Sequence, residues 1–317
     1  MQVAVLKETA AHEHRVALTP DSAGGLVKYK VDVMVQRGAG ERAGFADDAY
    51  VAAGARVADD AAASVAGASV LLKVQPPTDP ETALLAPGTV LLSLMRPGQH
   101  EAIARRLAER QVSALALELV PRITRAQSMD VLSSQSTVAG YKAVLIGAAE
   151  LPKFLPMLTT AAGNIQPGRV FVIGAGVSGL QAVATARRLG AVVSAFDVRP
   201  AAREQILSLG ATFVAADAVS ETAETSGGYA REQSDVERDR TLSAIANHVK
   251  DMDLVITTAN IPGKAAPRLI TDAMLRTMKP GAVIVDLAAE NGGNCEATRP
   301  GETVRAHGVT VIGPVNL

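Results

Sequence analysis

Short runs of β-branched and aliphatic residues alternate with longer alanine-rich stretches in the first part of the chain. Such runs, bounded by turn residues, are typical of strands buried on both faces, and the stretches between them have helical periodicity. The runs are Val3–Leu6, Val31–Val35, Val70–Val74, Val90–Leu94 and Ala114–Leu117. We therefore expect an α/β domain over residues 1–134, built on a mainly parallel sheet.

The same alternation returns in the second part of the chain. Helices are predicted over Gly179–Leu189 and Ala201–Leu209, each followed by a glycine that can end it. The predicted strands are Val170–Ile173, Val192–Phe196, Leu254–Thr257, Val283–Leu287 and Val309–Ile312. A second α/β domain, also with a parallel sheet, is expected over residues 135–317.

The segments between these regular stretches have other patterns. Apolar residues recur at helical spacing from Ser134 to Leu151, which predicts one long helix between the domains. Gly163–Gly168 is interpreted as a loop, and the polar, glycine-containing stretch Ala215–Arg240 as a mobile surface loop. The predicted fold class is α/β, with two Rossmann-like domains, each a mainly parallel sheet flanked by helices, joined by a long helix.

Composition narrows the function by exclusion. The chain of 317 residues has 31 Lys and Arg against 32 Asp and Glu and no long run of either sign, which argues against nucleic acid or an anionic membrane as a partner. The single cysteine, Cys295, cannot form an internal disulfide. Because no signal peptide and no apolar run of ~20 residues is present, we expect a cytoplasmic chain without direct membrane insertion.

A glycine-rich motif marks the first strand-to-helix turn of the second domain. It follows Val170–Ile173 directly and consists of Gly174, Ala175, Gly176, Val177, Ser178 and Gly179. Gly174 permits a tight turn, Gly176 lets a pyrophosphate approach the backbone, and Gly179 allows the helix to pack closely on the strand. The helix N-terminus then offers unpaired N–H groups to phosphates. The motif predicts a dinucleotide site.

The next strand is followed by Asp197, Val198 and Arg199, where the adenosine ribose of a dinucleotide would lie. A carboxylate here accepts hydrogen bonds from the ribose hydroxyls and repels a 2′-phosphate, so NAD(H) is the predicted cofactor. Arg199 leaves an alternative open, because it could pair with a 2′-phosphate or simply carry charge at the surface. No metal site is expected, since His12-Glu13-His14 lacks the spacing for two imidazoles on one helix face and is interpreted as a solvated loop.

Three segments together carry a resemblance to a known family: residues 122–136 (RITRAQSMDVLSSQS), the motif at Gly174, and residues 261–267 (IPGKAAP). Along essentially all its length the chain resembles the NAD(H)-binding component of proton-translocating NAD(P) transhydrogenase, whose nearest relative is alanine dehydrogenase. The resemblance implies hydride transfer between NADH on this chain and NADP⁺ on a partner component, with activity only when that partner is present. It also implies a membrane proton-channel component, peripheral attachment to the membrane through the partner, and a homodimer.

The resemblance further implies which residues act on the nicotinamide. In the family a loop with Arg, Gln and Asp wraps the nicotinamide end of NAD, and a second loop closes over the nucleotide with its Tyr. The matching residues here are Arg122, Gln127 and Asp130, with Ser133 close behind, and Tyr229. Direct transfer between two rings needs orientation and no proton transfer, so no general acid or base is expected from this chain. We expect the nucleotide in the cleft between the domains.

Alanine dehydrogenase is the main alternative function. Arg15 and Lys73 match positions that bind the oxo-acid substrate in that enzyme. Its chemistry also needs a proton-transferring imidazole after the strand Val90–Leu94, but Arg96 stands where that His should be. An arginine cannot act as a proton shuttle near neutral pH, because its guanidinium is not deprotonated there. The aspartate of that enzyme near the nicotinamide is replaced by Glu290.

A third alternative is a module that senses NAD(H) without turnover, which tight NADH binding without transfer to any acceptor would identify. Cys295 has no identifiable base and is interpreted as a small buried residue. Members of the resembled family continue beyond the motif that matches Gly313–Leu317 with a segment that packs back on the first domain. We expect this return segment to be absent here.

Overall fold

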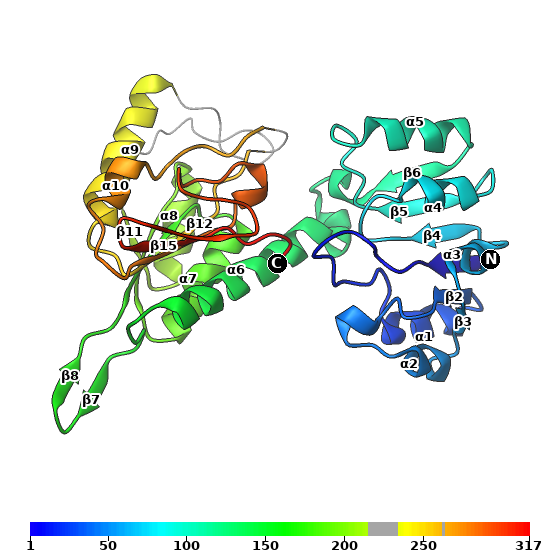
Figure 1. Ribbon diagram of the computed structural model, residues 1–317, viewed down its shortest axis with the longest axis horizontal. Helices are drawn as coiled ribbons and strands as arrows, with labels where there is room; N and C mark the ends of the chain where they lie inside the picture. The colour runs from blue at the N-terminus through cyan, green and yellow to red at the C-terminus, as the bar shows by residue number, and fades with distance from the viewer. Residues whose placement is uncertain (215–233, 262–263) are drawn as a thin grey trace. The chain divides into compact units, whose positions relative to one another are not determined.

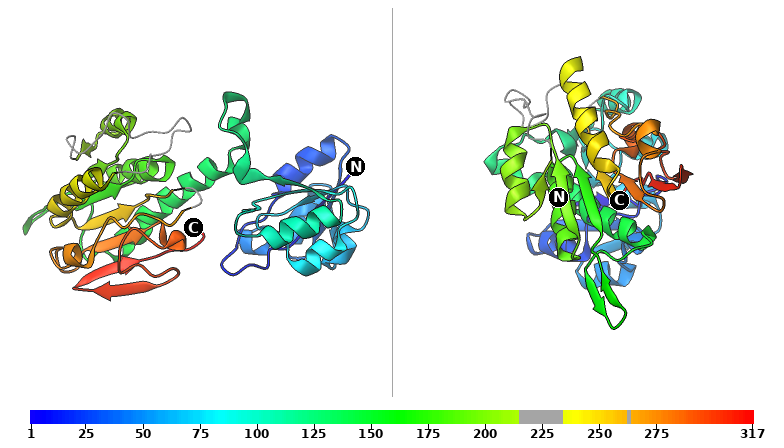
Figure 2. Two further views of the ribbon diagram at one scale, coloured as in Figure 1. Left: turned by 90° about the horizontal axis from the view of Figure 1, so that it is seen from above. Right: turned by 90° about the vertical axis from the view of Figure 1, so that its left-hand side faces the viewer.

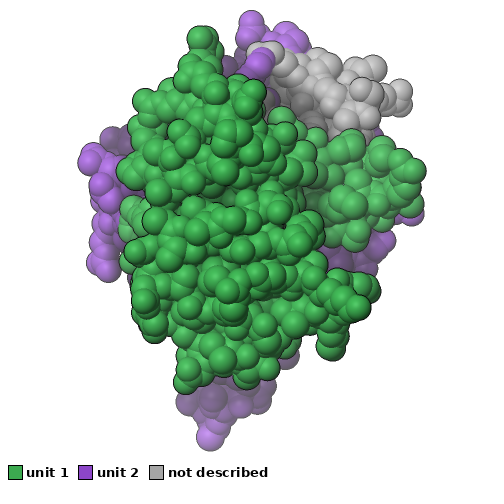
Figure 3. All heavy atoms as spheres, turned by 90° about the vertical axis from the view of Figure 1, so that its right-hand side faces the viewer, with its two compact units in different colours: residues 1–131 green, residues 132–317 purple. Residues whose placement is uncertain are grey.

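The computed structural model describes residues 1–214, 234–261 and 264–317. These residues form two compact units, Met1–Val131 and Leu132–Leu317, which are coloured separately in Figure 3. Each unit has a parallel or mainly parallel sheet flanked by helices, which confirms the predicted fold class. The predicted domain boundary after residue 134 stays a proposal, and it falls inside the long helix α6 (Val131–Glu150).

Unit 1, which lies wholly within the described residues, is built on a six-stranded sheet of order β3-β2-β1-β4-β5-β6 with parallel neighbours. Its strands are β1 (Gln2–Val5), β2 (Asp32–Gln36), β3 (Arg56–Ala58), β4 (Val70–Leu72), β5 (Val90–Ser93) and β6 (Ser113–Ala116). Its helices are α1 (Pro20–Lys28), α2 (Asp47–Ala52), α3 (Ala61–Val65), α4 (Asp79–Leu84) and α5 (Glu101–Glu109). Short 3₁₀ helices are η1 (Glu41–Ala43), η2 (Leu117–Leu119) and η3 (Thr124–Met129).

Both faces of this sheet are apolar, because successive side chains of a buried strand point to opposite sides and both sides are covered. Leu6, just after β1, packs into a core with residues of α3 and α5. Val5 points the other way, into a core with residues of α1 and α2 that includes Tyr50. The hydroxyl of Tyr50 donates to the carbonyl of Leu18 at 2.8 Å, so this buried polar group is satisfied.

Among the described residues of unit 2, seven strands form a sheet of order β11-β10-β9-β12-β13-β15-β14, with only the edge pair β14–β15 antiparallel. The strands are β9 (Arg169–Ile173), β10 (Val192–Phe196), β11 (Thr212–Phe213), β12 (Leu254–Thr257), β13 (Val283–Asp286), β14 (Thr303–Ala306) and β15 (Val309–Ile312). The helices are α6, α7 (Val177–Arg188), α8 (Pro200–Ser208), α9 (Asp235–Val249), α10 (Asp272–Leu275) and the 3₁₀ helix η5 (Ala289–Asn291). One core joins the sheet to α6, α7 and α8, and the other joins it to α9 and α10 (Figures 1 and 2).

The two sheets share one feature that positions ligands in such folds. In each, the first strand of the sheet along the chain (β1 or β9) is central, with the second and third strands of that sheet on one side and the fourth on the other. The connections therefore reverse direction between β1 and β4 and between β9 and β12. A crevice opens at the carboxyl ends of two such strands, which we call the switch point of each unit.

The structure corrects two sequence interpretations and adds strands that the pattern did not predict. Residues 163–165, interpreted as loop, form β8 (Gly163–Ile165), which pairs antiparallel with β7 (Leu158–Thr160) in a hairpin that projects from unit 2 (Figure 1). Residues 235–240, interpreted as part of a mobile loop, begin α9, because Ser234 and Glu237 form a capping box. Residues 215–233 of that predicted loop, including Tyr229, lie outside the described residues.

In the described part of the chain, no helix combines the length and apolar character that crossing a bilayer requires.

Candidate dinucleotide site

The turn between β9 and α7 is shaped by two glycines that the fold itself requires. Gly174 has a φ of +96°, in the left-handed region that favours glycine. A Cβ at Gly179 would lie 1.8 Å from the carbonyl oxygen of Gly174, so a side chain cannot be accommodated there without movement. These two residues let the helix start directly above the end of the strand.

Gly176 is not required by the fold in the same way. Its φ of −72° is accessible to any residue. A Cβ at this position would meet nothing within 4 Å, so the protein leaves open space beside this backbone. Since a bound pyrophosphate approaches the middle glycine in turns of this kind, a ligand explains Gly176 where internal packing does not.

The N-terminus of α7, like those of α2, α5 and α8, has no side-chain cap hydrogen bond. Helices α1, α3, α4, α9 and α10 each begin with a Ser, Thr or Asp side chain that accepts a hydrogen bond from a backbone N–H. The N-cap of α7 is Gly176, which has no side chain to do this. The first N–H groups of α7 and the positive end of its dipole are thus arranged for an anion from outside the helix.

Asp197, directly after β10, is tied to this turn. Its Oδ2 accepts a hydrogen bond from the backbone N–H of Ala175 at 2.7 Å, and its Oδ1 accepts one from the backbone N–H of Arg199 at 2.8 Å. The carboxylate is nearly buried, while the partly buried Val198 packs against the core on the α9 side. The acid that would contact an adenosine ribose is therefore fixed beside the phosphate-binding turn.

Arg199 forms an ion pair with Asp197, an arrangement that neither of its two sequence interpretations contained. Its Nε lies 3.0 Å from Oδ1 of Asp197, and its Nη2 lies 3.2 Å from Oδ2. The same Nη2 donates to the carbonyl oxygen of Ala175 at 3.1 Å. The side chain is only 19% exposed, so Arg199 is part of the site and not a surface charge.

Two residues that the sequence analysis did not single out also hold the turn. The hydroxyl of Thr258, just after β12, donates to the carbonyl of Gly174 at 3.0 Å. A Cβ at Gly140 of α6 would lie 2.1 Å from the carbonyl oxygen of Ser178, so a glycine lets α6 cross the start of α7. The sequence signal for this crossing was Gly140 with Gly147 two turns later, since residues seven apart share one helix face.

The loop after β13 supports the segment that carries Thr258. The side chain of Asn294 accepts a hydrogen bond from the N–H of Ala259 at 3.0 Å and donates to its carbonyl at 2.9 Å. Buried Asp286 in turn accepts from the N–H of Asn294 at 2.7 Å and from the N–H of Cys295 at 3.0 Å. Burial raises the pKa of the Cys295 thiol to about 11, which favours the thiol over the nucleophilic thiolate.

Four of the residues implied for the nicotinamide lie on one segment of the chain, which runs from the end of unit 1 into the start of unit 2. Arg122 is exposed and precedes η3, Gln127 is exposed within η3, and Asp130 follows that helix. Ser133 lies in the first turn of α6. The backbone N–H of Asp130 donates to the carbonyl of Gln127 at 3.2 Å, so the Gln and the Asp are presented on one tight turn. Tyr229 is outside the described residues.

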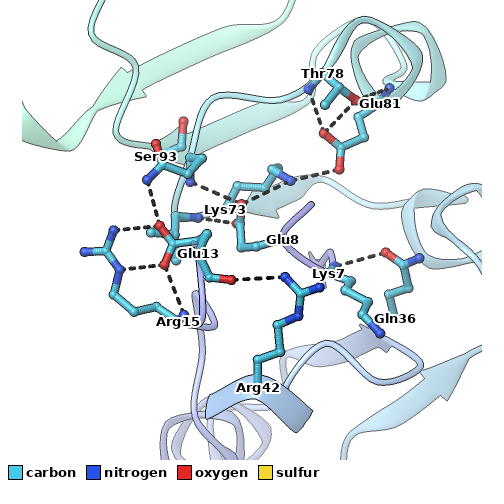
Figure 4. Close-up of polar contacts among 12 residues, drawn as sticks. Lys7, Glu8, Glu13, Arg15, Gln36, Arg42, Lys73, Thr78, Glu81 and Ser93 are labelled. Atoms are coloured by element: carbon cyan, nitrogen blue, oxygen red, sulfur yellow. Dashed lines mark hydrogen bonds and ion pairs between the residues drawn. The ribbon is translucent and has the colours of Figure 1, made fainter. Parts of the chain in front are cut away.

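In unit 1 the two cations that alanine dehydrogenase would use are held by acids of the same chain (Figure 4). The Nζ of Lys73 lies 2.8 Å from Glu81 and 3.5 Å from Glu8, and Lys73 is almost fully buried. Arg15 forms a fork with Glu13, with Nε at 2.8 Å from Oε1 and Nη2 at 2.7 Å from Oε2. Glu13 is 1% exposed, which corrects the interpretation of residues 12–14 as a solvated loop at this position, while His12 and His14 on either side are exposed.

Two acids of this cluster have pKa values shifted in opposite directions. Burial raises the pKa of Glu8, and the nearby Lys73 ammonium opposes this. Burial would also raise the pKa of Glu13, but hydrogen bonds from Arg15 and Gln75 outweigh it and lower the pKa to about 2. The cluster therefore keeps Arg15 neutralised by a carboxylate over the whole ordinary pH range.

Positions that acid–base chemistry would need are occupied by other groups. Arg96 has a φ of +43° and its N–H donates to Glu118 at 2.5 Å, while the N–H of Met95 donates to the same carboxylate at 3.0 Å. Glu290, in η5, accepts from the N–H of Asn316 at 2.9 Å. Among the described residues, no group of three or more His, Cys, Asp and Glu side chains is placed to hold a metal ion.

Comparisons with known proteins give one consistent result. Residues 4–139 match the family described as alanine dehydrogenase/PNT, N-terminal domain, and residues 143–317 match alanine dehydrogenase/PNT, C-terminal domain. An NAD(P) transhydrogenase alpha subunit of Rhodospirillum rubrum is 48% identical over 324 aligned positions, covering 100% of this chain and 84% of the relative. The crystal structure of transhydrogenase from Sinorhizobium meliloti has a TM-score of 0.89 and 45% identity, covering 99% of this chain and 86% of that one. The alanine dehydrogenase of Halomonas elongata is more distant, at 36% identity over 95% of this chain and 76% of its own length.

Proposed function

This chain belongs to the alanine dehydrogenase/PNT family, and from that premise we propose that it is the NAD(H)-binding component of a proton-translocating NAD(P) transhydrogenase. NAD(H) binding is common to the family. One observation carries the proposal: a glycine turn left open at Gly176, beside a buried Asp197, in a chain 48% identical along its whole length to a transhydrogenase alpha subunit. The substrate pair in this proposal is NADH on this chain and NADP⁺ on a separate component.

The described residues fit the adenosine half of NAD(H). The open backbone at Gly176 and the first N–H groups of α7 would hold the pyrophosphate. Asp197 would accept hydrogen bonds from the adenosine ribose, and its bond from the N–H of Ala175 keeps it at the right distance from the turn. Thr258 and Gly140 support these groups without contacting the nucleotide in this proposal. Thr258 fixes the turn through its hydrogen bond to Gly174, and Gly140 lets α6 pack against the start of α7.

The bound cofactor would supply the redox chemistry, because its dihydronicotinamide ring carries the hydride. The side chains of this chain then have only to orient the nicotinamide ring. We assign that role to Arg122 and Gln127 as hydrogen-bond donors, to Asp130 as an acceptor, and to Ser133 beside them. Tyr229 is assigned to closure over the nucleotide, which would exclude water. No residue is assigned as a general acid or base, since transfer between two rings moves no proton.

The proposal includes partners. A second nucleotide has to be delivered by an NADP(H)-binding component, and a membrane proton-channel component would attach the assembly to the bilayer and couple transfer to proton movement. A homodimer is also proposed. The β7–β8 hairpin supports it, because an isolated two-stranded ribbon is marginally stable in water and this one is flanked by Met157, which is 61% exposed (Figure 1).

The arrangement in unit 1 favours transhydrogenase over alanine dehydrogenase. Arg15 and Lys73 are engaged with Glu13, Glu8 and Glu81, and an arginine such as Arg96 cannot serve as the general acid and base where an imidazole would be needed. Amine and oxo-acid chemistry at carbon requires such proton transfer.

The deciding experiment measures hydride transfer from NADH to an NADP⁺ analogue with a distinct absorbance. It is done with this chain alone and with a candidate NADP(H)-binding component, and NADH binding is measured in parallel. We expect transfer only when both proteins are present. NADH binding without transfer in the presence of a competent partner would contradict the proposal and favour a sensor. Reduction of pyruvate with ammonium by this chain alone would instead identify an alanine dehydrogenase.

A further inference from the structure

The ion pair between Asp197 and Arg199 bears on how the site distinguishes NAD(H) from NADP(H). The carboxylate of Asp197 receives hydrogen bonds from the N–H of Ala175 and from the N–H, Nε and Nη2 of Arg199. These four donors, two of which belong to the guanidinium, offset much of the negative charge of the carboxylate. The carboxylate is thus neither bare nor uncompensated where a ribose would lie.

This compensation changes the electrostatic argument for specificity. A lone aspartate rejects a 2′-phosphate by like-charge repulsion. Here the guanidinium lies 3.0 Å from Oδ1, and both side chains are mostly buried, so the field of Asp197 is largely cancelled at close range. Charge repulsion by Asp197 alone therefore does not account for a strong preference.

The guanidinium itself is chemically suited to the ligand that Asp197 excludes. Its planar fork of N–H donors matches phosphate oxygens as well as carboxylate oxygens, and it stays charged at every accessible pH. It lies two residues beyond Asp197, the residue proposed to contact the ribose hydroxyls, and its Nη2 already reaches the phosphate-binding turn at the carbonyl of Ala175. Its ion pair with Asp197 is the contact that competes with a 2′-phosphate for these donors.

We propose that the guanidinium of Arg199 can bind a 2′-phosphate but is kept from doing so by its ion pair with Asp197. This ion pair then sets the preference of the chain for NAD(H). This inference rests on the proposed function insofar as it requires a dinucleotide in this turn. Asp197 acts less as a repelling charge than as an internal competitor for the guanidinium. Arg199 is accordingly a specificity-determining residue. When it is released by the change Asp197→Asn, it should favour binding of a 2′-phosphate.

The test uses two probes that differ by one group: adenosine 5′-monophosphate and adenosine 2′,5′-bisphosphate. Calorimetric binding of each to the full chain gives their affinity ratio, with NADH and NADPH fluorescence as a second pair. The variants are Asp197→Asn, Arg199→Gln, and the two together. Arg203→Gln, an exposed arginine of α8, is the matched control.

We expect Asp197→Asn to strengthen binding of the 2′,5′-bisphosphate by about 10- to 100-fold, the range of one hydrogen bond to a charged group. The gain should disappear in the double variant and should weaken with added salt. Arg199→Gln alone should have the opposite effect, because it leaves the Asp197 charge uncompensated and increases discrimination against the 2′-phosphate. Arg203→Gln should leave the ratio unchanged.

Two outcomes would overturn the inference. One is a gain in Asp197→Asn that persists in the double variant, which would place the 2′-phosphate on other groups. The other is an Arg199→Gln variant that weakens both probes equally, which is what a merely structural clasp on the turn predicts. This second variant keeps the test decisive if Asp197→Asn does not fold. Failure of the unmodified chain to bind NADH or adenosine 5′-monophosphate would instead count against the proposed function.

Discussion

The two switch points have the same place in the same strand order but opposite chemistry. In unit 2 the chain leaves β9 through glycines, and the groups facing the crevice are backbone N–H groups and an open glycine. In unit 1 the chain leaves β1 through Lys7 and Glu8, and Lys73 follows β4 (Figure 4). A doubly wound sheet always opens a crevice at this point. The residues at the ends of the strands therefore decide whether the crevice holds ion pairs of the protein itself or leaves backbone N–H groups available to a charged ligand.

The hydrogen bonds that join the strand ends also differ between the units, because the one in unit 1 involves a carboxylate and the one in unit 2 involves only neutral groups. In unit 1 the Oε1 of Glu8 accepts from the N–H of Val74 at 2.7 Å, so a buried charge joins the segments that follow β1 and β4. In unit 2 the hydroxyl of Thr258 donates to the carbonyl of Gly174, a short and neutral link that leaves the helix end exposed. We expect the charges of unit 1 to act on stability and the open groups of unit 2 to act on binding.

The largest effect should come from breaking the filled switch point. Lys73→Met leaves Glu8 and Glu81 buried without their shared cation, and we expect the free energy of unfolding to fall by about 3–5 kcal/mol. Urea unfolding measures this, with hydrogen exchange of the β1 amides reporting on unit 1. NADH affinity of the folded protein should not change. Lys28→Met, at the exposed end of α1, is the control and should lower the free energy of unfolding only slightly. Equal losses for both variants would show that the buried ion pairs of Lys73 contribute no more than an exposed lysine.

The second effect concerns a glycine that the fold of unit 2 requires. In Gly179→Ala the added methyl would meet the carbonyl oxygen of Gly174, so we expect a loss of about 1–3 kcal/mol together with weaker NADH binding. The control is Gly25→Ala in α1, where a Cβ meets nothing within 4 Å. That change should stabilise the helix by up to about 1 kcal/mol. If Gly179→Ala unfolds at the same urea concentration as the unmodified chain, the turn is more adaptable than its geometry indicates.

A third change separates binding from stability within the same turn. Gly176→Ala places a methyl in the open space beside the α7 N-terminus, so NADH affinity should fall by about tenfold or more, equal to about 1.4 kcal/mol. The free energy of unfolding should change by less than about 1 kcal/mol, because Ala restricts the unfolded chain but is a poorer N-cap than Gly. Fluorescence titration with NADH and urea unfolding of the same preparation measure both. An affinity that is unchanged would mean that no phosphate approaches Gly176, and the proposed site would be wrong.

The contrast between the units also marks what the sequence could predict. Strands of four or five apolar residues and the glycine motif are local signals, so five strands of each sheet and the turn at Gly174 followed from the pattern. The short edge strands β3, β11 and β14 did not. The hairpin of β7 and β8 did not, because its strands are three residues each and mostly exposed, without the alternation that a buried face produces. The start of α9 at Asp235 was missed although Ser234 and Glu237 carry a capping box, since the polar stretch before it dominated the interpretation.

At the sites, sequence could name residue types but not their pairing. Asp197 and Arg199 were both identified, yet the ion pair between them depends on χ angles and burial that no spacing encodes. Glu13 was interpreted as part of a solvated loop together with the histidines on either side. Only the fold shows that its side chain turns inward to Arg15 and Gln75. Thr258 could not be found for a similar reason: its partner Gly174 is 84 positions away and is brought near by the pairing of β9 with β12.

The smallest effect is a change of stability with pH, because two acids of the filled switch point act against each other. The pKa of Glu13 falls from 4.5 to about 2 on folding, so its contribution is present above pH 4.5 and is lost as the pH falls toward 2. The pKa of Glu8 is raised, so the folded chain binds that proton more readily than the unfolded chain, and acidification through this range favours folding. Glu13→Gln should remove the first contribution and leave the second. The free energy of unfolding of this variant, measured with urea from pH 6 to pH 3 against the unmodified chain, should therefore decline less steeply with acid. Identical slopes would mean that Glu13 keeps its ordinary pKa in the folded protein, and the buried fork with Arg15 would then have no part in filling the crevice.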